Sequence, residues 1–141
     1  MIECSYGINA WLYQPGTDPY FGPSTNPPAQ SWPHSESAVP TSTIPLLGDA
    51  FWVDSAPFED DMPPQQDVYD GQIAQNWSDW SDVPSSMARY CMTRHGNGIN
   101  IVFLDGHVEH EQLSNLWNLN WAYGWQTPIP MPYSYFIKQL P

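Results

Sequence analysis

The chain of 141 residues carries three Lys or Arg against fifteen Asp or Glu, a formal net charge of −12. Such a charge repels phosphate backbones, and nucleic-acid binding needs clustered cations, so nucleic acid is excluded as a partner. The same charge suits a divalent cation or a cationic partner surface, or serves solubility alone. Aromatic residues make up 15% of the chain, which predicts one folded domain, residues 1–141, despite sixteen prolines.

The sequence contains no segment that would insert into a membrane. No apolar run reaches the roughly 18 residues that span a bilayer. Residues 1–15, MIECSYGINAWLYQP, lack the basic start and unbroken apolar core of a signal peptide. We therefore expect the chain as given to be soluble, either as a whole protein or as the soluble part of a longer one.

The two cysteines, Cys4 and Cys91, form no CxxC pair and so do not predict a zinc site. In an oxidising compartment they could form a disulfide that closes a long loop, worth about 3–5 kcal/mol in the chain-entropy model. In a reducing compartment they would be buried thiols. Both alternatives stay open.

The first predicted elements in chain order are two strands separated by a loop. Residues 4–13, CSYGINAWLY, alternate as a strand rich in aromatic and β-branched residues does. Residues 14–40 are dominated by Pro, Gly, Ser, Thr and Asn and are predicted to be loop. Residues 43–53, TIPLLGDAFWV, are apolar again, and Pro45 and Gly48 predict an edge strand or a bulged one.

An acidic, irregular segment follows, residues 54–84. It contains FEDDMPP, DVYDG and NWSDWSD, and a loop of this length in a compact domain is often functional. Residues 85–93, SSMARYCMT, fit either a further strand or a connector.

Residues 99–110 carry the clearest local signal, an apolar run that meets Asp105-Gly106. Asp-Gly after such a run predicts a two-residue type I′ hairpin turn, which needs positive φ at both positions. This turn would pair Leu104 with His107, Phe103 with Val108, Val102 with Glu109, and Ile101 with His110. Strand alternation then places Ile101, Phe103, Val108 and His110 on one face and Val102, Leu104, His107 and Glu109 on the other. The first strand is apolar on both faces, which predicts an interior strand, with its partner nearer water.

After the hairpin, apolar residues recur at helical spacing. They are Leu113, Leu116, Trp117 and Trp121. A short amphipathic helix of one to three turns is predicted here, laid against the sheet, and residues 127–141 form an extended, proline-punctuated tail. The chain therefore predicts an α+β fold: a small antiparallel sheet built from residues 5–13, 44–53 and 99–110, with one short helix and long Pro-rich loops.

Histidines and acids around the hairpin raise the question of catalysis. The candidates for a general acid–base pair are His95, Asp105, His107, Glu109 and His110. The turn already accounts for Asp105, however, and strand pairing puts His107 and His110 on opposite faces. Ser35 and Ser37 lie beside His34 in predicted loop, without a nucleophile-elbow pattern. We therefore expect no catalytic residues and no enzymatic activity.

The sequence offers residues for two kinds of metal site. His107 and Glu109 share a strand face and His95 could approach them, as in a zinc site, but strand histidines more often make hydrogen bonds. Calcium suits the acidic segment better, because hard cations take carboxylates and carbonyls from irregular loops. The possible calcium ligands are Asp60, Asp61, Asp67 and Asp70. A solvated acidic loop without an ion is the alternative, since no EF-hand pattern is present.

The same segment offers aromatic side chains for sugar binding. Trp77 and Trp80, in NWSDWSD, could stack on pyranose rings while neighbouring acids accept hydrogen bonds from hydroxyl groups. Tryptophan also pins loops to small cores, which is its commoner use. Both uses stay open.

Four fragments of the chain occur in a familiar order. His95, nine residues and then Asp105-Gly106 lie within RHGNGINIVFLDGHVEH, and LWNLNW follows at residues 116–121. CSYGINAWLY lies near the start and IPLLGDAFW at residues 44–52. Together they resemble the prepilin-type, processing-associated H-X9-DG pseudopilin-like proteins, with the acidic segment and the tail unmatched.

The resemblance implies a type IV pilin-like globular head. Its implied function is that of a non-enzymatic structural subunit or adaptor of a cell-envelope secretion or pilus-like system. Its implied partners are other pseudopilin-like subunits or secretion-system proteins. His95, Asp105 and Gly106 then form a structural signature, in which His95 bonds to backbone or to a nearby carboxylate. The alternative function is an extracellular carbohydrate- or calcium-binding module.

The resemblance also implies a place in the cell. Family members begin with a basic leader, a processing site and a long apolar helix that anchors them in the inner membrane. This sequence shows none of these, so we expect membrane contact only through a helix that it lacks. The head itself is expected at the periplasmic or extracellular face. Major pseudopilins of type II secretion carry calcium in a head loop, which favours calcium here without naming ligands.

Overall fold

The computed structural model describes residues 6–12, 32, 39–65, 85–132 and 137. Its five strands are β1 (Tyr6–Asn9), β2 (Pro45–Asp49), β3 (Asp54–Ser55), β4 (Gly98–Phe103) and β5 (Val108–Gln112). They form one sheet in the order β3-β1-β2-β4-β5, in which β1 and β3 run parallel and every other pair is antiparallel. The sheet is therefore mixed rather than wholly antiparallel as expected, and the fold is a small α+β or mostly-β one.

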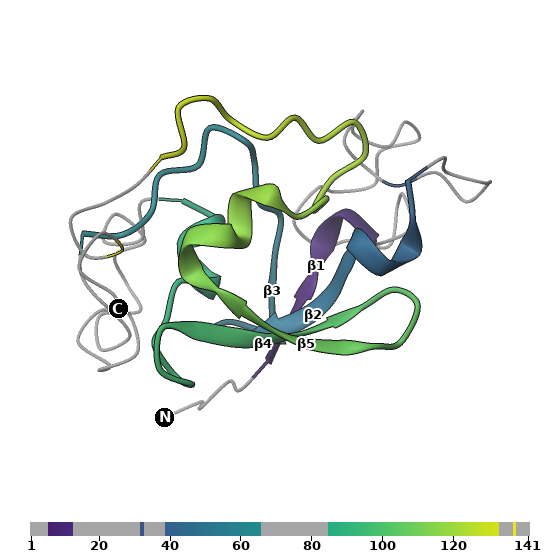
Figure 1. The fold of residues 1–141 in the computed structure, drawn as a ribbon, viewed down its shortest axis with the longest axis horizontal. Helices are drawn as coiled ribbons and strands as arrows, with labels where there is room; N and C mark the ends of the chain where they lie inside the picture. Colours follow the sequence, from purple (N-terminus) through teal and green to yellow (C-terminus); the bar gives the residue numbers. More distant parts are fainter. Residues whose placement is uncertain (1–5, 13–31, 33–38, 66–84, 133–136, 138–141) are drawn as a thin grey trace.

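The helical turns of the described segments are short 3₁₀ helices. They are η1 (Ala10–Leu12), η2 (Thr41–Thr43), η5 (Met87–Tyr90) and η6 (Leu113–Asn118). Figure 1 shows η6 lying over one face of the sheet. The core forms between them from Ile99, Ile101 and Phe103 of β4 and from Leu113, Leu116 and Trp117 of η6. We call the opposite face of the sheet the outer face.

Tryptophan side chains fix the loops to this core. Five indole N–H groups donate to backbone carbonyl oxygens: Trp11 to Pro57, Trp32 to Trp121, Trp117 to Asp61, Trp121 to Leu116 and Trp125 to Trp117. Each ring packs apolar surface while its one polar atom donates to a backbone carbonyl, three of them in loops (Pro57, Asp61 and Trp121) and two in η6 (Leu116 and Trp117). Tryptophan thus compensates for the scarcity of regular structure.

β1 is shorter than the predicted strand at 4–13 because Asn9 ends it. The buried Asn9 carboxamide accepts a hydrogen bond from the backbone N–H of Trp11 at 3.2 Å, and it donates to the carbonyls of Pro45 and Trp121. A side chain that bonds nearby backbone in this way competes with the strand ladder. The chain therefore turns into η1 directly after Asn9.

β2 resolves the two alternatives for the second apolar stretch. It lies between β1 and β4, so it is not an edge, and its register with β4 shifts between Pro45 and Leu47. The bulged strand was therefore the right alternative. Residues 85–93 form a connector that contains η5.

The predicted helix is present in reduced form. Leu113, Leu116 and Trp117 are buried as the spacing indicated, but η6 ends at Asn118. Leu119 is extended, with φ −84° and ψ 151°, so Trp121 reaches the core from beyond the helix. Among the described residues, no helix has the length and apolarity to cross a bilayer.

Candidate functional site

The hairpin between β4 and β5 turns through three residues, not two. The backbone N–H of Gly106 donates to the carbonyl of Phe103, and that of Phe103 donates to the carbonyl of His107, both at 2.9 Å. Only Gly106 has a positive φ, 92°, which is the pattern of a type I turn followed by a bulge. Asp105 keeps a negative φ and its carboxylate accepts the N–H of His107 at 3.1 Å. The predicted type I′ turn was therefore wrong.

The extra turn residue shifts the pairing of β4 and β5 by one. The observed pairs are Asn100–His110, Ile101–Glu109 and Val102–Val108. A shift of one residue moves every β5 side chain to the opposite face. Val108 and His110 therefore lie on the outer face, not beside Ile101 and Phe103 as predicted. The interior place of β4 and the exposure of β5 are as expected.

His107 lies between two carboxylates at the hairpin tip. Its ring stacks on Phe103, with ring centroids 4.4 Å apart and planes 2° from parallel. Nδ1 lies 2.6 Å from Asp105 Oδ1, and Nε2 lies 3.7 Å from Glu109 Oε2. The hydrogen bonds from the His107 side chain and backbone lower the pKa of Asp105 below its ordinary value. The side chains of Asp105, His107 and Glu109 are all exposed to water. Their contacts with one another and with the backbone N–H of His107 stabilise the turn.

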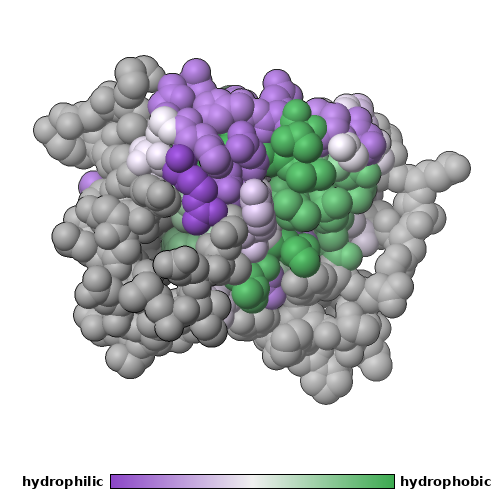
Figure 2. All heavy atoms as spheres, turned by 90° about the horizontal axis from the view of Figure 1, so that it is seen from below, coloured by the Kyte–Doolittle hydropathy of each residue, from purple (hydrophilic) through white to green (hydrophobic). Residues whose placement is uncertain are grey.

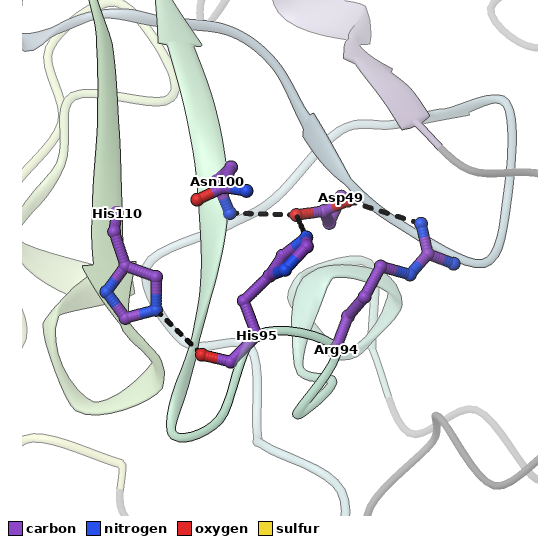
Figure 3. Close-up of polar contacts among 5 residues, drawn as sticks. All are labelled: Asp49, Arg94, His95, Asn100 and His110. Atoms are coloured by element: carbon purple, nitrogen blue, oxygen red, sulfur yellow. Dashed lines mark hydrogen bonds and ion pairs between the residues drawn. The ribbon is translucent and has the colours of Figure 1, made fainter.

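His95, the other end of the H-X9-DG element, contacts a carboxylate that is distant in sequence. His95 Nε2 lies 3.1 Å from Asp49 Oδ2, and Arg94 Nη1 lies 3.2 Å from Asp49 Oδ1 (Figure 3). The backbone N–H of Asn100 donates to Asp49 Oδ2 at 2.8 Å. The Asp49 side chain is only 1% exposed, so these donors replace the water that an ionised carboxylate requires.

The turn that carries His95 is tied to β4 and β5. The backbone N–H of His95 donates to the carbonyl of Gly98 at 3.3 Å, and Gly96, within this turn, has a φ of 81°. His110 of β5 places Nε2 3.0 Å from the carbonyl oxygen of His95. A Cβ at Gly98 would collide with the carbonyl oxygen of Glu111 and approach the His110 ring to 2.8 Å. The glycine thus lets the turn and β5 meet.

Together, Asp49, Arg94 and His95 join β2 to the turn before β4, and His110 extends the connection to β5. The Asp49 carboxylate is contacted by Arg94, by His95 and by the backbone N–H of Asn100. Such an arrangement holds strands in register.

Asp49 was not singled out by the sequence reading, although it lies within IPLLGDAFW. A usable signal was present: an acid inside an apolar strand must find a cation or strong donors when buried. The Lys and Arg residues of the whole sequence that could pair with this acid are Arg89, Arg94 and Lys138. Arg94, adjacent to the signature histidine, was therefore a natural partner.

The predicted calcium ligands divide between described and undescribed residues. Asp60 is exposed. Asp61 Oδ2 accepts the backbone N–H groups of Phe58 and Met87, at 3.1 and 2.7 Å. Burial raises the pKa of Asp61, and those two hydrogen bonds oppose the rise. Asp67 and Asp70 lie outside the described residues, within which no group of three or more His, Cys, Asp or Glu is arranged to hold a metal ion. Calcium binding stays a prediction.

Other sequence predictions fall partly or wholly outside the described residues. Trp77 and Trp80 lie there, as does Cys4, while Cys91 is buried in the core. Sugar stacking and the disulfide therefore stay predictions.

No protein-family model, no curated protein and no solved structure matches this chain in the three comparisons made. The site is therefore interpreted from its own geometry.

Proposed function

We infer that this protein is a non-enzymatic, pseudopilin-like structural subunit or adaptor of a cell-envelope secretion or pilus-like system. The observation that carries the proposal is how the H-X9-DG element is used. His95 binds the buried Asp49, and Asp105 caps the turn in which Gly106 supplies the positive φ. Each member of the element thus makes its contact, or supplies its backbone conformation, within its own domain.

The rest of the described structure fits a head domain of this kind. A small mixed sheet is covered by η6 on one face, and long loops are fixed by tryptophan. Five of the described indole N–H groups donate hydrogen bonds to backbone carbonyls, which favours anchoring of the chain over sugar stacking for those tryptophans. We place the head at the periplasmic or extracellular face of the envelope, with other pilin-like subunits as partners.

Fractionation of source cells tests this proposal. An antibody raised against the 141-residue chain is expected to detect the native product in the envelope fraction. Formaldehyde treatment of intact cells is expected to shift it into larger complexes that contain pilin-like subunits. Sequencing the native locus around the Met1 codon is expected to reveal a processing site and an apolar helix of about 20 residues.

Two results would reject the proposal. One is a native product that stays in the soluble fraction and forms no cross-links. The other is a catalytic activity of the purified chain that His107→Ala abolishes while the melting temperature is unchanged.

A further inference from the structure

β5 forms one end of the sheet, and its outward backbone groups are unused. Phe103 and His107 exchange a ladder hydrogen bond, so the alternation of an antiparallel pair turns the N–H and C=O of Val108 and His110 away from β4. The N–H of Gln112 points the same way. Across the described segments, no hydrogen bond reaches these groups. Such an edge is a template for a further strand.

An apolar row leads across the outer face to this edge. In register, Ile8 lies opposite Leu47, Leu47 opposite Val102, and Val102 opposite Val108. Val108 is 64% exposed and Ile8 is 40% exposed. Figure 2 shows the hydrophobic area on this side of the molecule, bordered by a hydrophilic one. A strand added beside β5 with an apolar residue opposite Val108 would lengthen the row and cover its exposed end.

The opposite face of the same edge carries two carboxylates whose side-chain partner among the described residues is a histidine, His107, and not a Lys or Arg. Glu109 is 61% exposed, and Asp105 lies at the turn beside it. The sequence has no Lys or Arg from residue 95 to residue 137. Among the described cations, Arg94 is engaged by Asp49 and Arg89 donates to the carbonyl of Asp54 at 3.2 Å. A basic side chain opposite Glu109 would therefore meet a carboxylate that has no Lys or Arg partner among the described residues.

The same charges disfavour a second copy of this chain as the added strand. If two β5 strands pair antiparallel about His110, Glu109 of one copy lies opposite Glu111 of the other. If instead His110 of one copy pairs with Val108 of the other, the two Glu109 residues lie opposite each other. Like charges directly opposite each other destabilise a pair, and each copy carries a net charge of −12.

We propose that the β5 edge binds an extended segment of another protein by strand addition, and that this segment alternates apolar with Lys or Arg residues. Its backbone bonds to Val108, His110 and Gln112, its apolar residues continue the row that ends at Val108, and its cations face Glu109. Backbone bonds supply affinity and the two faces supply selectivity. The edge recruits such a strand whether or not the protein is a pilin-like subunit.

The test uses blocked, fluorescein-labelled nine-residue peptides and the full chain. In the first peptide Val and Lys alternate. The second has the same composition, but all Val residues precede all Lys residues. In the third, Val and Glu alternate. Fluorescence anisotropy at low ionic strength is expected to rank the alternating Val–Lys peptide first. At saturation, amide exchange at Val108, His110 and Gln112 is expected to slow by about tenfold, more than at the inward amides of Glu109 and Glu111.

Two variants and one control separate strand addition from attraction to an acidic protein. Glu109→Lys is expected to bind the Val–Lys peptide about fivefold more weakly and to gain affinity for the Val–Glu peptide. Asp60→Lys makes the same change of charge on an exposed residue that is not part of β5 and should bind as the unaltered chain does. Gln112→Pro removes one outward N–H at a residue whose φ, −68°, suits proline, and should weaken binding without unfolding the chain.

Three outcomes would overturn the proposal. Equal binding of the alternating and block peptides, or equal weakening by Glu109→Lys and Asp60→Lys, would mean that net charge alone attracts the peptide. Unchanged exchange at Val108 and His110 would place the peptide elsewhere. Dimers of the unliganded chain in sedimentation, dispersed by Gln112→Pro, would make a second copy the occupant.

Discussion

The two ends of the H-X9-DG element use the same chemistry in opposite surroundings. Asp49 accepts hydrogen bonds from His95 and from a backbone N–H, and Asp105 accepts them from His107 and from a backbone N–H. The contact to histidine is shorter at Asp105, 2.6 Å against 3.1 Å. Yet Asp49 is excluded from water, whereas Asp105 is 37% exposed and water can replace its partners. Burial rather than distance therefore decides which aspartate stabilises the fold.

Substitution of the buried aspartate is expected to give the largest effect. Asp49→Ala removes the side-chain acceptor of the Asn100 N–H and one ionic partner of the Arg94 guanidinium. Arg94 and His95 are partly exposed and regain some water, so the loss falls at the low end for a broken buried pair, about 3 kcal/mol. Thermal unfolding should show a melting temperature lower by roughly 10 °C.

Asp105→Ala is the matched control, because it removes the same chemical group from the exposed end. Its melting temperature should lie much closer to that of the unaltered chain. Asp49→Asn should fall between, since an amide oxygen can still accept the N–H of Asn100. Equal shifts for Asp49→Ala and Asp105→Ala would show that burial does not separate the two ends.

Local patterns predicted those parts of the fold that depend on neighbouring residues. The apolar run before Asp105-Gly106 predicted a hairpin with an interior strand, and both β4 and its exposed partner β5 are present. The turn type was missed because Asp-Gly serves a two-residue turn and a three-residue turn with a bulge equally well. The two turns differ in the φ of Asp105, which is positive in the two-residue turn and negative in the observed one, where only Gly106 has a positive φ. The Asp-Gly pair is compatible with either value.

The partner of His95 could not be obtained from local pattern. Asp49 lies 45 residues from Arg94 along the chain, and the register of β2 against β4 brings them together. The register shifts near Pro45. Pro45 and Gly48 predicted a bulged or an edge strand, but they did not predict which residues of β4 would lie opposite β2. The helical spacing likewise did not predict that η6 ends at Asn118, beyond which the Trp121 indole donates back to the carbonyl of Leu116.

The turn glycines allow the two ends to be compared without any side-chain contact. Gly96 lies beside His95 and Gly106 beside Asp105, with φ of 81° and 92°, and an added Cβ would meet nothing within 4 Å at either position. Gly96→Ala and Gly106→Ala should therefore each lower the free energy of unfolding only by the backbone term, about 1 kcal/mol. Urea unfolding measures both. Asparagine at position 106, which tolerates positive φ, should recover part of the loss. A loss above about 3 kcal/mol at Gly106 would mean that the turn is coupled to the core.

The smallest expected effect is in acid titration, where a half-buried and an exposed carboxyl should separate in opposite directions. Burial raises the pKa of Asp61, so its ionised form opposes folding, and this penalty is relieved as the pH falls through the raised pKa. The hydrogen bond from His107 lowers the pKa of Asp105. The ionised Asp105 carboxylate therefore stabilises the fold above the ordinary pKa value of 3.8, and this stabilisation is lost as the pH falls through the lowered pKa.

Carboxyl NMR during acidification should therefore show Asp61 gaining its proton before Asp105. His107→Ala should return Asp105 toward 3.8 and leave Asp61 unmoved, because the two shifts have separate causes. Identical midpoints for the two carboxyls would contradict the opposite shifts. An Asp105 midpoint insensitive to His107→Ala would show that the histidine side chain does not lower the pKa of Asp105 and would leave the backbone N–H to account for the shift.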